Sequence, residues 1–131
     1  MKKSILGVLF LILLITLSSC NKDQRAVKRL NGKWESVKIG GFSIPNTHES
    51  HHTLRFNECK LKDDEYCEVT IEDAESSIKT LYRIENDGTR LVYKTDEEDV
   101  VSEIVTLEKN KLILKSNYDG VGLVEIEYSK I

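Results

Sequence analysis

The chain has 131 residues, of which 31% are charged, and its formal net charge is −3 at pH 7. This length suits one domain with a single core. The acidic balance, with both signs interleaved along the chain, excludes the clustered basic face on which nucleic-acid binding depends.

The first residues are typical of an export signal. Lys2 and Lys3 form a short positive region, and residues 5–17 form a predominantly apolar run that is too short for a comfortable membrane span. Without the two lysines, seventeen basic side chains face twenty-two acidic ones, so the exported part has a formal charge of −5.

The apolar run ends in the residues Leu17, Ser18, Ser19 and Cys20. This ending resembles the lipobox of bacterial lipoproteins, and the resemblance implies cleavage before Cys20 and lipidation of that cysteine. An ordinary signal peptide and an uncleaved anchor are the alternatives. We expect a signal peptide over residues 1–19, a lipidated tether over 20–24 and one domain over 25–131.

A short helix and a first strand follow the tether. Asp23 is positioned to cap a helix that runs to Leu30. Gly32 ends the helix, and the β-branched and aromatic residues 34–39 predict a strand whose imperfect alternation indicates a bulge. Residues 40–50 then form the longest predicted loop, a length that is common in lids and binding segments.

Alternation of apolar and polar residues continues to the C-terminus and predicts seven more strands. These strands cover residues 53–57, 66–71, 78–84, 91–95, 100–107, 112–116 and 122–129. The connections are mostly short, and no helical segment is long enough for a crossover, so neighbouring strands should be antiparallel. We predict an all-β fold, an eight-stranded up-and-down barrel in which the last strand pairs with the first, with a β-sandwich as the alternative.

One short motif sharpens this prediction. Gly32, Lys33 and Trp34 follow the short helix and open the first strand, and they resemble the Gly-x-Trp signature of lipocalins. The whole layout resembles the lipocalin-like lipoproteins of Gram-negative bacteria. The resemblance implies that Trp34 seals one end of the barrel. This sequence lacks the arginine that lipocalins pack across that tryptophan, and Lys130 is the nearest substitute.

Cys59 and Cys67 flank a predicted strand connection, and in an oxidising envelope compartment such a pair favours a disulfide. Two free thiols remain the alternative, because alternation counted from Phe56 places Cys59 on the outer face.

The sequence predicts no metal site and no cofactor. His48, His51 and His52 cluster at the long loop beside Glu49, but they lack a fixed ligand spacing. The acidic runs 63–65 and 96–99 do not match a calcium-binding loop and are typical of solvated turns.

Nothing in the sequence indicates catalysis, and we predict that the protein is not an enzyme. There is no nucleophile elbow and no phosphate-binding glycine loop. The candidate lining of a ligand pocket is aromatic, with ordinary core packing as the alternative. It comprises Trp34, Phe42, Phe56, Tyr82 and Tyr93.

We therefore expect a lipoprotein anchored in the outer membrane through Cys20, facing the periplasm or the cell surface. Its expected role is to bind a small apolar or amphipathic ligand or to support envelope maintenance. The competing hypothesis is a protein-interaction module that binds an envelope protein as an inhibitor or assembly accessory.

Overall fold

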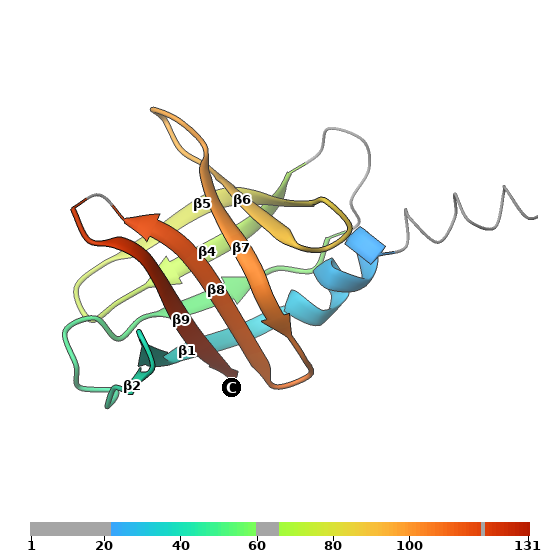
Figure 1. Cartoon of the computed structure of the whole chain (residues 1–131). Helices are drawn as coiled ribbons and strands as arrows, with labels where there is room; N and C mark the ends of the chain where they lie inside the picture. Colours follow the sequence, from blue (N-terminus) through green and yellow to red (C-terminus); the bar gives the residue numbers. More distant parts are fainter. Residues whose placement is uncertain (1–21, 60–65, 119) are drawn as a thin grey trace, which may run out of the picture.

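The computed structural model describes residues 22–59, 66–118 and 120–131. One antiparallel sheet in the order β2-β1-β3-β4-β5-β6-β7-β8-β9 closes on itself through pairing of β1 with β9 (Figure 1). The strands are β1 (Gly32–Ile39), β2 (Phe42–Ser43), β3 (Thr53–Phe56), β4 (Cys67–Glu72), β5 (Ser77–Glu85), β6 (Arg90–Lys94), β7 (Val100–Leu107), β8 (Lys111–Tyr118) and β9 (Gly122–Lys130). The predicted closed eight-stranded barrel is confirmed, with β2 as one extra strand.

Strand β1 closes the barrel and carries the predicted bulge. Its register against β9 runs from Trp34 opposite Lys130 to Ile39 opposite Ile126, and it shifts between Ser36 and Lys38. The bulge bends β1 so that its first half can also pair with β3, while its last two residues pair with β2. The predicted loop over residues 40–50 was therefore wrong at its start, because Gly40 and Gly41 make a tight turn into β2.

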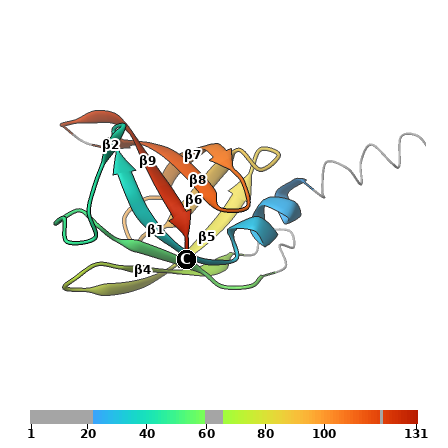
Figure 2. The same ribbon diagram turned by 90° about the horizontal axis from the view of Figure 1, so that it is seen from below.

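A helix over residues 22–30 covers one end of the barrel. Its buried side chains Ala26, Val27 and Leu30 belong to the hydrophobic core. Arg29 Nη1 donates a hydrogen bond to the carbonyl oxygen of Leu107 at 3.3 Å. Figures 1 and 2 both place this helix at the end of the barrel opposite the tip formed by β1 and β2. The helix therefore plugs this end of the barrel, and it includes residues 22–24, which we had assigned to the tether.

Asp23 does not cap the helix as predicted. It lies inside the helix, and its carboxylate accepts a hydrogen bond from the backbone N–H of Gly88 at 2.6 Å. Gly88 lies in the turn between β5 and β6 with φ near 80°. A Cβ at this position would lie 3.3 Å from the Lys22 carbonyl oxygen. Only glycine combines this left-handed conformation with so close an approach to the helix.

The Gly-x-Trp motif has a physical explanation at the closed end. Trp34 is fully buried, and its indole N–H donates to the Leu30 carbonyl oxygen at 2.8 Å. Lys130 Nζ lies 5.2 Å from the centre of the Trp34 ring, so this lysine takes the place of the missing arginine. Gly32 has φ of 123°, and a Cβ there would approach Lys130 Cε within 2.9 Å.

The sulfurs of Cys59 and Cys67 form the predicted disulfide, with their Cα atoms 5.8 Å apart. The alternation counted from Phe56 was misleading, because β3 ends at Phe56 and the chain beyond it no longer follows the strand. Cys67 is buried and Cys59 packs against the core. In the chain-entropy model a loop of this size contributes about 2 to 3 kcal/mol of stability.

Candidate functional site

Side chains that face the barrel interior become more exposed with distance from the helix. On β5 the inward positions run from Ile84, 2% exposed, through Tyr82 at 0% and the half-buried Thr80 to Ile78 at 58%. The inward positions of β7 and β8 rise in the same way, to 45% at Val100 and 44% at Tyr118. We call the end marked by Ile78, Val100 and Tyr118 the open end. Inward side chains there are exposed because the helix closes only the opposite end.

The interior carries several hydroxyl groups between the closed end and the open end. Ser36 and Ser102 are the buried polar side chains of the described chain, and Ser102 shares a hydrogen bond with Ser116 across β7 and β8. Tyrosines also point inward from four strands. They are Tyr82, Tyr93, Tyr118 and Tyr128.

Tyr82 holds the most unusual group in the interior. Its ring packs edge-on against Phe56 with the centres 5.0 Å apart, and the residue is fully buried. Its hydroxyl has no hydrogen-bond partner within the described part of the chain. An unsatisfied buried donor costs about 1 to 3 kcal/mol, so a group that accepts this bond would recover stability.

Burial favours the neutral form of Tyr82, Tyr93 and Tyr128. It raises the pKa of Tyr82 to about 12. Burial also raises the pKa of Tyr93, with smaller contributions from Tyr118 and Tyr82, and that of Tyr128, with contributions from Tyr93 and Tyr118. At neutral pH Tyr82, Tyr93 and Tyr128 present O–H groups rather than phenolates.

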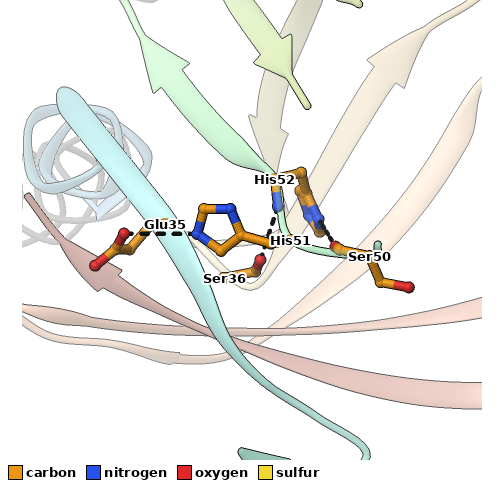
Figure 3. Close-up of polar contacts among 5 residues, drawn as sticks. All are labelled: Glu35, Ser36, Ser50, His51 and His52. Atoms are coloured by element: carbon orange, nitrogen blue, oxygen red, sulfur yellow. Dashed lines mark hydrogen bonds and ion pairs between the residues drawn. The ribbon is translucent and has the colours of Figure 1, made fainter. Parts of the chain in front are cut away.

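His52, on the same face as Leu54 of β3, also reaches into the interior. Its Nε2 lies 2.7 Å from the Tyr128 hydroxyl, and its Nδ1 lies 2.8 Å from the Ser50 carbonyl oxygen. Because the carbonyl can only accept, Nδ1 carries the proton, and in the neutral ring Nε2 accepts the proton of Tyr128. The backbone N–H of His52 donates to Ser36 Oγ at 2.9 Å (Figure 3). The Tyr128 hydroxyl therefore has a hydrogen-bond partner in the interior, whereas the Tyr82 hydroxyl has none among the described residues.

The predicted aromatic set is divided by the structure. Phe56, Tyr82 and Tyr93 lie together, with Tyr82 directly opposite Tyr93 on β5 and β6. Trp34 lies in the buried closed end, and Phe42 on β2 is 79% exposed at the opposite end. The sequence therefore identified three side chains in the middle of the barrel interior, but it did not identify His52 and Tyr128 as their neighbours. Alternation in the last strand marks Tyr128 as inward, whereas His52 precedes its strand and gave no signal.

The other two histidines line a separate surface pocket of about 350 Å³. His51 Nε2 lies 3.6 Å from a carboxylate oxygen of Glu35, and His48 Nδ1 accepts from the Ser50 backbone N–H at 3.0 Å (Figure 3 shows the pair of His51 and Glu35). Among the described residues, no group of three or more histidine, cysteine or acidic side chains has metal-binding geometry. The acidic residues 96–99 are exposed, and the run 63–65 lies outside the described residues.

Within the described ranges, no helix has the length and apolar character needed to cross a membrane. The predicted signal peptide and the lipidation residue Cys20 lie outside those ranges.

No protein-family model matches the sequence, and no curated protein matches it. The crystal structure of zebrafish ileal bile acid-binding protein complexed with cholic acid is similar to this chain, with a TM-score of 0.45 and 14% sequence identity. The similarity covers 79% of this chain and 99% of that one. At such low identity it assigns no ligand, so the function is argued from the residues of this chain alone.

Proposed function

We propose that this protein is a lipid-anchored, lipocalin-like lipoprotein of the Gram-negative envelope whose barrel binds a small apolar or amphipathic molecule through its open end. The observation that carries the proposal is the rise in exposure of inward side chains from Tyr82 to Ile78. A barrel that only needed to be stable would bury these apolar groups against one another. An eight-stranded barrel has an interior of the right size for one small ligand.

The interior also combines the two surfaces that an amphipathic molecule needs. Ile71 and Val124 offer partly exposed apolar area on opposite parts of the wall. The hydroxyls of Tyr82 and Tyr93 offer polar groups below them, nearer the core. Pockets of this kind bind by apolar contact and orient the ligand by a few polar groups.

A pair of tryptophan variants tests whether the interior binds. Ile71→Trp places extra bulk inside the open end, whereas Thr70→Trp places it on the outer face of the same strand. We expect the fluorescence of the uncharged probe N-phenyl-1-naphthylamine to rise on binding to the wild type and to Thr70→Trp, and to show at least about tenfold weaker binding to Ile71→Trp. Equal binding to all three proteins would rule out the interior as the site.

Protein interaction is the second candidate function, and one observation favours it. Phe42, Val121 and Leu123 are 79%, 74% and 67% exposed, and they lie on β2 and the β8–β9 hairpin near the open end. Large exposed apolar groups are typical of interaction sites. In that case Phe42→Lys and Leu123→Lys would abolish co-purification of an envelope protein, while Ile71→Trp would leave it unchanged.

A further inference from the structure

The positions of the charged side chains around the barrel interior limit the charge that a ligand can carry. Alternation directs the charged side chains of the strands to the outer face. There Glu85 lies 3.7 Å from both Arg83 and Arg90, and Lys111 lies 3.8 Å from Glu127. The inward exception among the described strands is Lys130, and it is at the closed end, where its Nζ lies over Trp34 and donates to the Arg29 carbonyl oxygen.

An ionised ligand seated among the inward side chains of the described strands would therefore meet no opposite charge in the open half of the barrel. Burying a carboxylate or an ammonium without a partner is strongly unfavourable. Among the described residues, His52 is the ionisable side chain that reaches this part of the interior, and both of its ring nitrogens already contact Ser50 and Tyr128. The barrel interior is thus suited to a molecule without net charge.

The unpaired hydroxyl of Tyr82 indicates which polar group that molecule carries, namely a hydrogen-bond acceptor. A phenol O–H with no partner lacks an acceptor, and this side chain is fully buried. Cys67 and Tyr93 are its neighbours across β4 and β6, and neither supplies that acceptor. Thr80, the next inward residue on β5, is partly exposed, so Tyr82 lies one inward position deeper than the first partly exposed side chain.

We infer that the ligand is an uncharged, mainly apolar molecule with an oxygen acceptor, such as a ketone, ester or alcohol. This oxygen accepts a hydrogen bond from the Tyr82 hydroxyl, and the inference rests on the proposed function. The apolar part of the ligand extends past Thr80 towards Ile78. The four steps along the strand from Tyr82 to Ile78 span about 13 Å, which sets the length of ligand chain that the interior covers.

Competition between matched molecules tests this assignment. Decan-2-one and decanoate have chains of similar length but differ in charge, and each is used to displace N-phenyl-1-naphthylamine near neutral pH, below its micelle-forming concentration. We expect decan-2-one to displace the probe at a concentration at least about tenfold lower than decanoate does. Equal or better displacement by decanoate would overturn the inference while leaving the proposed function intact.

The role of the hydroxyl is tested by Tyr82→Phe, which keeps the ring. This variant should bind decan-2-one roughly three- to tenfold more weakly than the wild type does, a larger loss than any change in its affinity for N-phenyl-1-naphthylamine, which has no oxygen acceptor. Tyr66→Phe is the control, because Tyr66 lies on the outer face near Arg83 and Lys94. If Tyr82→Phe binds decan-2-one unchanged, the hydroxyl is not the donor. If the wild type binds neither probe nor competitor, the proposed function fails and the inference fails with it.

Discussion

Tyr82 and Tyr128 both place a hydroxyl inside the barrel, but only Tyr128 has a hydrogen-bond partner, the ring of His52. The two tyrosines therefore make opposite contributions at the scale of single residues. A hydrogen-bonded buried hydroxyl stabilises the fold modestly, whereas an unpaired one destabilises it. Groups that reduce stability are common where a protein binds something.

This difference predicts opposite effects of two identical substitutions. Tyr82→Phe should raise the free energy of unfolding by about 1 kcal/mol, because it removes an unpaired donor and keeps the packing against Phe56. Tyr128→Phe should lower it by about 1 to 2 kcal/mol, because His52 Nε2 loses its partner. Urea unfolding measures both, and an equal loss in the two variants would contradict the assignment of partners.

The raised tyrosine pKa values predict a loss of stability in alkali. Below about pH 10 Tyr82 is neutral in both the folded and the unfolded chain, so its ionisation does not affect stability. Above that pH the unfolded chain ionises while folded Tyr82, with its pKa of about 12, does not. The free energy of unfolding should fall by on the order of 2 to 3 kcal/mol between about pH 10 and 12 from this residue alone.

Urea unfolding at several pH values, with tyrosinate absorbance followed in parallel, checks this prediction. Tyr82→Phe is the control and should lose less stability over the same range. A stability that stays constant above about pH 10 would show that the tyrosines ionise freely in the folded protein.

Some of the site residues could be predicted from the sequence, because alternation along a strand shows which side chains point into the barrel. It marked Tyr82 as inward and grouped it with Phe56 and Tyr93, which the structure brings together. It also included Phe42, which is aromatic but exposed. An unpaired hydroxyl depends on what every neighbouring strand supplies, so no pattern within one strand can show it.

At the scale of elements, the contact between the helix and the β5–β6 turn can be tested with two glycines. Gly88 and Gly41 have φ of 80° and 84°, so alanine is similarly strained at both positions. A Cβ on Gly41 meets nothing within 4 Å, whereas one on Gly88 lies 3.3 Å from the Lys22 carbonyl oxygen and 3.4 Å from Ala26 Cβ. The two substitutions therefore differ mainly in what they do to the helix.

We expect Gly41→Ala to lower the free energy of unfolding by about 1 kcal/mol and Gly88→Ala by about 1 kcal/mol more. Thermal or urea unfolding gives both values. An equal loss of stability in the two variants would contradict close packing of the helix against the β5–β6 turn.

Most elements could be predicted because strands of eight or nine residues show several cycles of alternation, as β5 and β9 do. The strand β2 was missed because two residues carry no period. Asp23 was misassigned for another reason. Its partner Gly88 is 65 residues away in the sequence, and a local rule for helix capping does not include such contacts.

At the scale of the whole molecule, the positions of the two ends bear on the proposed anchor. The described residues start at position 22, within the helix at the closed end. The open end lies at the opposite side of the barrel (Figure 1). A lipid on Cys20 would therefore hold the closed end near the membrane and direct the open end away from it.

Replacing Cys20, the proposed lipidation site, tests the anchor separately from the barrel. Cys20→Ala should move the protein from the membrane fraction to the soluble fraction of the envelope, because an attached acyl chain supplies the membrane affinity. Unfolding in urea should be unchanged, since Cys20 precedes the barrel. An unchanged membrane fraction would contradict the lipidation of Cys20.

The pairing of β1 with β9 also bears on when the chain can fold. These two strands stand at opposite ends of the domain, and the Ile131 backbone N–H donates to the Lys33 carbonyl oxygen at 2.9 Å. A contact between such distant residues forms late, because it requires the largest loop closure in the chain. During synthesis β1 can pair with β2 and β3 early, but its pairing with β9 must wait until β9 has been made. Until then the barrel stays open, and the pairing of β9 with β1 is the step that closes it.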